Sequence, residues 1–191
     1  MISGIAIAGL NGAGKSTLAH ALARELGYFE MDAEDDWFPE QSVSRRLALD
    51  GAPLPRTGEN GPLPFSKPVS RSEAERGILE DMLRHPGFVF ASVRMDWGEA
   101  ITSRIGIVFL LEAPLDERLR RIRSREERRF GPRVLPGGDM YAQQAAFRDT
   151  VAGRDMTEVT GSLARLPCPI VTIDAARPVP ECVRQMLDSL A

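Results

Sequence analysis

Residues 9–16 read GLNGAGKS, and this stretch decides the fold. It matches the pattern G-x-x-x-x-G-K-[ST] without a mismatch. A short apolar run with β-branched residues, 2–8, precedes it and predicts a buried strand. Residues 15–26 follow and predict a helix, because leucines recur at every fourth position and Gly27 stands where helices commonly end. A strand, a glycine turn and a helix in this order are the context that makes the pattern specific.

The chemistry that this loop predicts is the binding of polyphosphate. Gly12 and Gly14 permit backbone angles closed to other residues, so successive N–H groups point into one anion-binding concavity at the start of a helix. Lys15 is predicted to neutralise β- and γ-phosphate oxygens, Ser16 to bind Mg²⁺ through its hydroxyl, and Thr17 to contact the α-phosphate. The expected ligands are therefore ATP and Mg²⁺. The residues predicted to bind the nucleotide are Gly9, Asn11, Gly12, Ala13, Gly14, Lys15, Ser16, Thr17 and Arg121.

The rest of the chain alternates between strand and helix patterns. Four more apolar strands are predicted, at 28–31, 88–93, 105–111 and 170–173. Helices are predicted at 73–84, 115–129, 140–159 and 180–190, and over part of 33–49. This alternation predicts an α/β fold with a parallel sheet covered by helices on both faces. Residues 50–70 are rich in Pro and Gly and predict an irregular loop.

Length and composition narrow the class of protein. The 191 residues fit one domain, predicted as 1–191, with the 43% hydrophobic and 27% charged residues of an ordinary globular protein. A net charge of −3 offers no basic field to a nucleic acid, so nucleic acid is not an expected partner. No signal peptide and no membrane-spanning segment are predicted, so the expected location is the cytoplasm.

The chain resembles the nucleoside-monophosphate kinase and shikimate kinase group of small P-loop kinases. The matching stretches are GLNGAGKST, LARELGYFEMD, an arginine-dense stretch after the fourth strand, and IVTIDAARPVPECV. The resemblance implies a five-stranded sheet of strand order 2-3-1-4-5. It also implies an acceptor-binding region at 33–75 and a mobile lid at 120–140. Residues 33–70 match no acceptor-site pattern of that group, so the resemblance does not name the acceptor.

The arginine-dense stretch, 117–133, reads ERLRRIRSREERRFGPR. Its arginines recur near the helical period, so one face of the helix is almost purely cationic. Such a face suits the charge that gathers on the transferred phosphoryl group. The alternative is a solvated face of Arg and Glu pairs at helical spacing. The arginines expected to act in transfer are Arg125 and Arg129 first, then Arg121 and Arg133.

Acidic residues follow two of the predicted strands. Asp32 ends the second strand, at the edge where open α/β sheets bind ligands, and is predicted to orient or deprotonate the acceptor. Asp96 follows the third strand and is predicted to reach Mg²⁺ through water. For Asp35 and Asp36 a solvated loop is an equal alternative. The predicted metal ligands are Ser16, Asp32 and Asp96, and the predicted catalytic residues are Lys15, Asp32, Arg125 and Arg129.

Aromatic and cationic residues are candidates for the acceptor site. Trp37 and Trp97 each follow an acid and either stack on the acceptor or pack in the core. Arg94 is a candidate contact for an anionic acceptor. The acceptor region also contains Arg45, Arg46, Arg56 and Arg71. Convergence of several arginines would indicate an anionic acceptor such as a nucleotide, whereas a single arginine would indicate a sugar or other polyol.

These patterns predict a kinase that moves the γ-phosphate of Mg-ATP to a small molecule: a nucleotide, a sugar or another metabolite. No N-K-x-D or T-K-x-D run is present, so the sequence does not favour a GTPase. Two alternatives stay open. One is an ATP-driven switch or regulatory ATPase that uses 33–70 to contact a macromolecule. The other is a nucleotide-binding module without catalysis.

Overall fold

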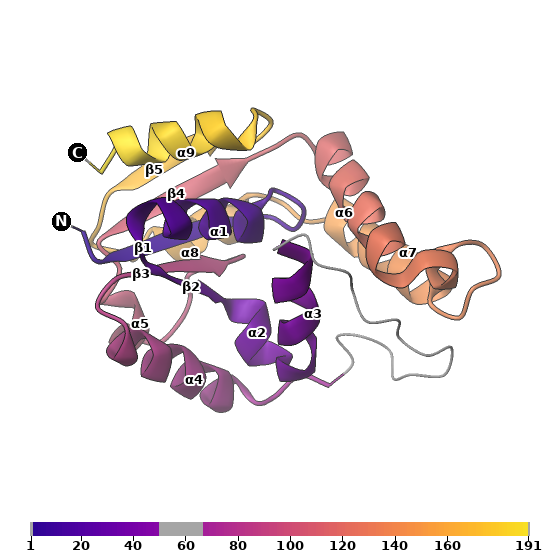
Figure 1. The fold of residues 1–191 in the computed structure, drawn as a ribbon, viewed down its shortest axis with the longest axis horizontal. Coiled ribbons are helices and arrows are strands. Elements are labelled where there is room, and N and C mark those ends of the chain that lie inside the picture. The colour runs from indigo at the N-terminus through magenta and orange to yellow at the C-terminus, as the bar shows by residue number, and fades with distance from the viewer. Residues whose placement is uncertain (1, 50–66, 191) are drawn as a thin grey trace.

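The computed structural model describes residues 2–49 and 67–190, and five of its strands form one parallel sheet (Figure 1). The strand order is β2-β3-β1-β4-β5, which confirms the predicted fold class and order. Because neighbouring strands all run parallel, their carboxyl ends meet at one edge of the sheet. The strands are β1 (Gly4–Gly9), β2 (Phe29–Asp32), β3 (Phe88–Ser92), β4 (Ile107–Glu112) and β5 (Ile170–Asp174).

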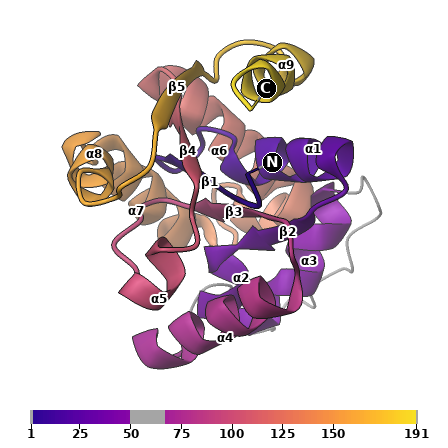
Figure 2. The ribbon, with the colours of Figure 1, turned by 90° about the vertical axis from the view of Figure 1, so that its left-hand side faces the viewer.

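Helices cover both faces of the sheet (Figure 2). The helices on one face are α1 (Lys15–Leu26) and α9 (Val179–Asp188). The helices on the other are α4 (Arg71–Arg84), α5 (Glu99–Thr102) and α8 (Thr157–Leu163). Within the described residues, none of the helices is long and apolar enough to cross a membrane.

The remaining helices lie toward the carboxyl edge of the sheet (Figure 1). After β2 come α2 (Ala33–Trp37) and α3 (Pro39–Leu49). After β4 the chain forms a hairpin that projects from the body, which we call the arm, 115–152. The arm consists of α6 (Leu115–Phe130), the 3₁₀ helix η1 (Gly131–Val134) and α7 (Tyr141–Ala152).

The central strand β1 explains why both faces are covered. All six of its residues are buried. Ile5 and Ile7 belong to the core under α1 and α9, whereas Ala6 and Ala8 belong to the core under α4 and α8. Because side chains alternate along a strand, this unbroken apolar run places hydrophobic groups on both faces, and each face needs a helical cover.

The helix predicted over 140–159 is wrong in one respect, because the structure divides it into α7 and α8. Gly153 follows the last residue of α7, and glycine weakens a helix interior. The Asp155 side chain then accepts a hydrogen bond at 2.7 Å from the backbone N–H of Thr157, which favours a new helix start. Most of the predicted irregular loop, residues 50–66, lies outside the described residues.

Asp36 is wedged between α2 and α4. A Cβ added to Gly77 of α4 would lie 2.4 Å from Asp36 Oδ1, so the glycine allows this close approach. Burial, and then the neighbouring carboxylate of Asp81, raises the pKa of Asp36 to about 7. The folded protein therefore holds a proton at this site under conditions in which an exposed aspartate has lost it.

We expect Asp36→Asn to stabilise the protein at about pH 8 but to change its stability little at about pH 4. The unfolded carboxyl ionises near pH ~3.9, whereas the folded one keeps its proton to about pH 7. Wild-type stability therefore falls relative to the variant as pH rises through this window. Urea unfolding at both pH values measures the difference. Glu80→Gln, which removes an exposed acid of α4, is the control, and an equal gain at both pH values would contradict the assignment.

Candidate active site

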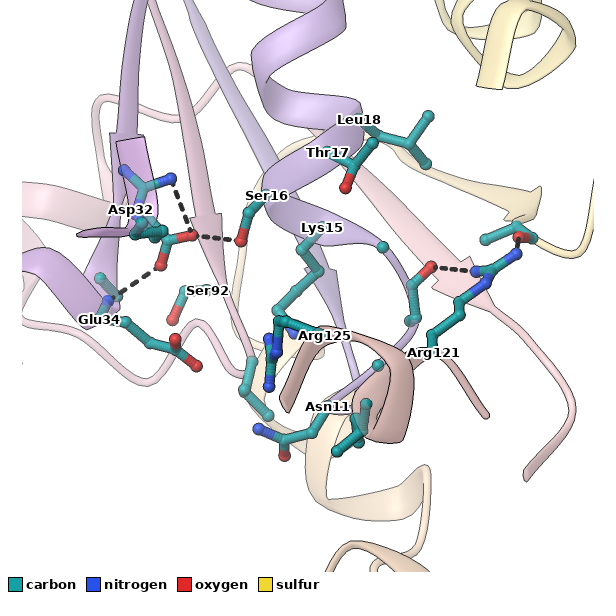
Figure 3. A pocket seen from close by; sticks show the side chains of 18 of the residues that line it. Asn11, Lys15, Ser16, Thr17, Leu18, Asp32, Glu34, Ser92, Arg121 and Arg125 are labelled. Atoms are coloured by element: carbon teal, nitrogen blue, oxygen red, sulfur yellow. Dashed lines mark hydrogen bonds and ion pairs between the residues drawn. The ribbon is translucent and has the colours of Figure 1, made fainter. Parts of the chain in front are cut away.

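The loop between β1 and α1 lines a cavity of about 780 Å³ at the carboxyl edge of the sheet (Figure 3). Gly12 and Gly14 have φ angles of 82° and 103°, in the left-handed region that favours glycine. A Cβ on Gly12 would lie 2.5 Å from the carbonyl oxygen of Arg118 in α6, so no larger residue fits there. The predicted nucleotide-binding residues that line the cavity are Asn11, Gly12, Ala13, Gly14, Lys15, Ser16, Thr17 and Arg121.

Gly9, also predicted to bind the nucleotide, lies outside the cavity lining. It is the last residue of β1, and a Cβ there would lie 2.9 Å from the carbonyl oxygen of Leu111 in β4. The glycine at this position therefore allows the close packing of two strands, and its contact with the nucleotide stays a prediction.

Lys15 extends from the start of α1 into the cavity (Figure 3). Its Nζ donates a hydrogen bond to the carbonyl oxygen of Leu10 at 3.2 Å. Burial holds the pKa of Lys15 below its ordinary value, although the carboxylate of Glu34 opposes this effect. The charges of Arg125 and Arg154 lower the pKa further. Cations crowded in this way are stabilised by an anion in the same space, so the charges fit a polyphosphate.

Ser16 and Asp32 are joined by a short hydrogen bond. Ser16 Oγ donates to Asp32 Oδ2 at 2.5 Å, and the backbone N–H of Glu34 donates to Asp32 Oδ1 at 3.0 Å (Figure 3). The Asp32 side chain is therefore held at the junction of β2 and α2. Burial, and then the charge of Glu34, raises the pKa of Asp32 to about 6.

The Ser16–Asp32 pair fits Mg²⁺, which takes oxygen ligands. Among residues 2–49 and 67–190, no group of three His, Cys, Asp or Glu side chains is placed to hold a metal. Mg²⁺ needs no such cage at a phosphoryl-transfer site, because it keeps several waters and also binds substrate phosphates. One hydroxyl and one carboxylate are therefore enough ligands for the protein to contribute to Mg²⁺.

Asp96, the third predicted metal ligand, lines the cavity next to two arginines. Its carboxylate lies 3.7 Å from Arg94 Nε and 3.9 Å from Arg71 Nη1, and its side chain is 42% exposed. The structure thus gives Asp96 two arginine neighbours, and its contact with Mg²⁺ stays a prediction.

The arm supplies the arginines predicted to act in transfer. Arg125 and Arg129 line the cavity, and so does Arg128. Burial, with the neighbouring charge of Arg125, lowers the pKa of Arg129 to about 10. Arg133 was expected to act with them, but its Nη2 lies 2.6 Å from Asp139 Oδ2 near the tip of the arm. This arginine lies outside the cavity lining and joins the two ends of the turn between η1 and α7.

Arg121 ties the phosphate loop to the far side of the sheet. Its Nη1 donates to the carbonyl oxygen of Ala13 at 3.2 Å, and its Nη2 donates to that of Ala175 at 2.9 Å (Figure 3). Ala175 follows β5, the strand at one edge of the sheet. Arg121 therefore holds the P-loop against the loop after β5.

Arg154 and Glu34 are among the charged residues of the cavity that were not predicted. Arg154 lies between α7 and α8, and its Nη1 donates to Asn11 Oδ1 of the P-loop at 2.6 Å. The sequence pattern placed it inside a continuous helix, although Gly153 before it marks the break. Glu34 points toward Lys15 and Asp32 from the start of α2 (Figure 3). In the sequence, Glu34 could have been recognised by its position two residues after Asp32. It was not singled out because it lies within a run of acidic residues.

Arg45 of α3 lies at the centre of a buried ionic cluster. Its Nη1 donates to Glu30 Oε1 at 2.9 Å and lies 3.7 Å from Asp32 Oδ2, and its Nε donates to Asp35 Oδ1 at 2.7 Å. Only 8% of Arg45 is exposed. The cluster joins α3 to β2 and α2, so this guanidinium balances protein carboxylates.

Of the other arginines of the acceptor region that the structure describes, Arg71 lines the cavity and Arg46 does not. Arg46 is 57% exposed in its side chain and lies 3.7 Å from Asp35. Arg56 lies outside the described residues. Besides Arg45, only Arg71 of the four predicted arginines lines the cavity in the part of the chain that the structure describes.

We expect Arg45→Met to lower the free energy of unfolding by about 3–5 kcal/mol, because it leaves several buried carboxylates without their cation. Arg46→Met, the neighbouring exposed position, is the matched control and should change stability by less than about 0.5 kcal/mol. Urea unfolding of both variants at neutral pH measures the difference. Equal effects of the two substitutions would show that the buried cluster contributes nothing specific.

With this geometry established, comparisons with known proteins are informative. YqaC of Bacillus subtilis, described as an uncharacterised protein, is 27% identical over 199 residues, which span 100% of this chain and 99% of YqaC. A gluconokinase from Sinorhizobium meliloti has a TM-score of 0.54 at 19% identity, covering 99% of this chain and 91% of its own. A shikimate kinase from Acinetobacter baumannii, in complex with shikimate, has a TM-score of 0.54 at 20% identity, covering 100% and 93%.

The structural matches confirm the fold that the resemblance implied, the frame of the small P-loop kinases. A family model described as an AAA domain matches residues 5–133, which include the P-loop, four of the five strands and α6. Because this match covers more than half of the chain, the protein belongs to the AAA domain family of P-loop proteins.

Proposed function

We propose that this protein is an ATP-dependent kinase that transfers the γ-phosphate of ATP to a small-molecule acceptor. The observation that carries the proposal is that one cavity is lined both by the P-loop and by residues of the predicted acceptor region. One end lies near Arg121 and Ala175, after β5, and the other near Trp37, after β2. Since β5 and β2 are opposite edges of the sheet, the P-loop lies between these two ends. A nucleotide and an acceptor can therefore meet at the phosphate loop.

The known relatives support this assignment at the level of the fold. The structures with similar folds are named as a gluconokinase, a sugar kinase and shikimate kinases. Each of these names describes phosphoryl transfer to a small molecule. The chain shares their fold over almost its whole length.

The P-loop and its neighbours would hold the polyphosphate. Gly12 and Gly14 have positive φ angles just before α1, which would let backbone N–H groups turn toward an anion, and the helix dipole also favours an anion there. Lys15 turns from the Leu10 carbonyl oxygen toward phosphate oxygens. Ser16 and Asp32 would hold Mg²⁺, which would supply positive charge that offsets the negative charge of the phosphates.

The carboxylates opposite Lys15 would receive the proton of the acceptor. The pKa of Asp32, about 6, leaves its carboxyl ionised near neutral pH, as a general base requires. Glu34 faces the same space and takes this role where Asp32 is occupied by Mg²⁺ (Figure 3). The acceptor oxygen forms a bond to the γ-phosphorus, the bond to the β,γ-bridging oxygen breaks, and ADP is released.

The arm would close the site during transfer. Arg125, Arg129 and Arg154 place positive charge where the oxygens of the transferred group gather negative charge. Movement of the predicted lid, 120–140, toward the predicted acceptor region, 33–75, would exclude water that could otherwise hydrolyse ATP. The boundaries of both regions remain predictions.

The rival reading, an ATP-driven switch, is less well supported. It would use 33–70 as an exposed surface for a macromolecule. The described part of that region is instead joined to β2 by the hydrogen bond between Arg45 and Glu30, and it lines a cavity of about 780 Å³. Small-molecule sites typically measure about 300–1,000 Å³, so the size of the cavity favours a metabolite as the second ligand.

The assay is ATP turnover with and without a panel of hydroxyl-bearing metabolites. We expect at least one compound to raise ADP formation and to appear as a phosphorylated product by ³¹P NMR. Lys15→Ala should weaken binding of a non-hydrolysable ATP analogue by about tenfold or more in calorimetry, because it removes a charge-assisted contact. Turnover that no compound accelerates, or ATP affinity that survives Lys15→Ala unchanged, would contradict the proposal.

Arg125 and Arg123 form a matched pair on α6. Arg125 lines the cavity, whereas Arg123 is exposed and lies outside its lining. We expect Arg125→Met to lower kcat by about 100-fold or more, because it removes charge that stabilises the transition state. Arg123→Met should keep kcat within about twofold. Steady-state kinetics of both variants decide the matter, and equal losses would show that the arm acts only through its net charge.

A further inference from the structure

The acceptor end of the cavity is walled by tryptophan. The chain contains two tryptophans, Trp37 and Trp97, and both line this end. Their ring centroids are 6.0 Å apart and their planes are tilted by 41°. Trp97 is held by Ser92, whose Oγ accepts from its Nε1 at 3.2 Å, and by the edge of Phe90 at 6.1 Å. The indole is therefore fixed in place before any ligand arrives.

The arginines at this end already have acidic partners. Arg71 Nε lies 3.0 Å from Glu75 Oε1, and a second nitrogen of Arg71 donates to the carbonyl oxygen of Asp96. Arg94 Nε lies 3.7 Å from the Asp96 carboxylate. Arg45, buried beside them, is bound to the carboxylates described above. An anionic acceptor would have to displace one of these existing pairs.

The phosphate end is charged differently. Arg125 and Arg128 line it, and neither forms an ion pair with any residue of 2–49 or 67–190. Lys15 is bound there only to a carbonyl oxygen. In the described part of the cavity, the excess of positive charge thus lies where the triphosphate is expected. At the acceptor end, the described arginines are balanced by carboxylates.

The acceptor end of the cavity also contains oxygen atoms that can accept hydrogen bonds from hydroxyl groups. Asp32, Glu34 and Ser92 lie together on the side of the cavity toward the acceptor region (Figure 3). Carboxylate oxygens accept hydrogen bonds from hydroxyls, and an indole face packs against the apolar face of a ring. A rigid aromatic wall with a few acceptors suits a ring compound that carries hydroxyls and no charge.

Resting on the proposed kinase function, we infer that the acceptor is a neutral, hydroxyl-bearing ring compound of the sugar, cyclitol or nucleoside class. One face of its ring packs on Trp97 and Trp37. The hydroxyl that receives phosphate donates to Asp32 or Glu34, which takes its proton as the oxygen bonds to the γ-phosphorus. An acceptor that carries a phosphate or carboxylate group is disfavoured, because Asp96 and Glu75 already neutralise the arginines that would bind it.

Tryptophan fluorescence reports on this site alone, because both indoles of the chain line it. The probes are neutral and anionic partners of one ring skeleton: glucose with glucuronate, uridine with uridine monophosphate, and methyl shikimate with shikimate. We expect at least one neutral member to change the emission with a Kd about tenfold or more below that of its anionic partner. Trp97→Leu should weaken that binding about tenfold, while the affinity for an ATP analogue stays unchanged.

A second variant tests the charge argument directly. Asp96→Asn leaves Arg94 without its carboxylate and Arg71 with Glu75 as its remaining acidic partner, so it should raise the affinity for the anionic member of each pair. Glu99→Gln, which removes an exposed acid outside the cavity lining, is the control and should change neither affinity. No gain in anion affinity with Asp96→Asn would count against neutralisation by Asp96.

The outcomes separate this inference from the proposed function. An anionic compound that binds as tightly as its neutral partner and is phosphorylated overturns the inference and leaves the kinase standing. A neutral compound that binds at the tryptophans without being phosphorylated overturns the kinase and leaves the neutral site standing. No change in emission with any of the six probes rejects the neutral-ring acceptor.

Discussion

The glycine loop approaches the backbone of α6 so closely that only a residue without a side chain fits at Gly12. Around this contact, two arginines of the arm and Arg154, which follows the arm, hydrogen-bond to the loop. Arg118 Nη1 lies 3.4 Å from the Asn11 carbonyl oxygen, and Arg121 and Arg154 donate to the loop at shorter distances. The phosphate loop and the arm are thus one structural unit, and the phosphate that binds the first must also meet the second.

The two sides of the cavity are opposite in charge for a reason that lies in the chain order. Acids follow β2, where Asp32 and Glu34 begin α2, and arginines follow β4, where α6 begins. In a parallel sheet both segments emerge at the same edge, with the P-loop after β1 between them. Crossover topology therefore brings a carboxylate pair and a row of guanidinium groups to opposite walls of one site.

Ion pairs within the protein decide which of these arginines are available to bind a ligand. Arg45 is bound by protein carboxylates, and Arg71 and Arg94 share Asp96, whereas Arg125 faces the cavity. A buried ion pair contributes little net stability, but breaking one leaves an uncompensated charge. The paired arginines are consequently poor sites for a new anion, and this asymmetry distinguishes the proposed phosphate end from the proposed acceptor end.

The sequence alone determined the parts whose chemistry is local. GLNGAGKS predicts its own backbone shape and ligand, and apolar runs separated by helical patterns predict a covered parallel sheet. Asp32 was predicted because it directly follows a strand. These properties depend on neighbours within a few residues, so they can be read from the chain.

Only the tertiary structure decided what each charged side chain faces. Arg133 and Arg125 look alike in sequence, yet one pairs with Asp139 and the other lines the cavity. Arg154 reaches Asn11 from 143 residues away, and Asp96, in the loop after β3, meets Arg71 of α4. Long polar side chains are placed by whichever distant partner the packing brings near them, and no local pattern encodes that partner.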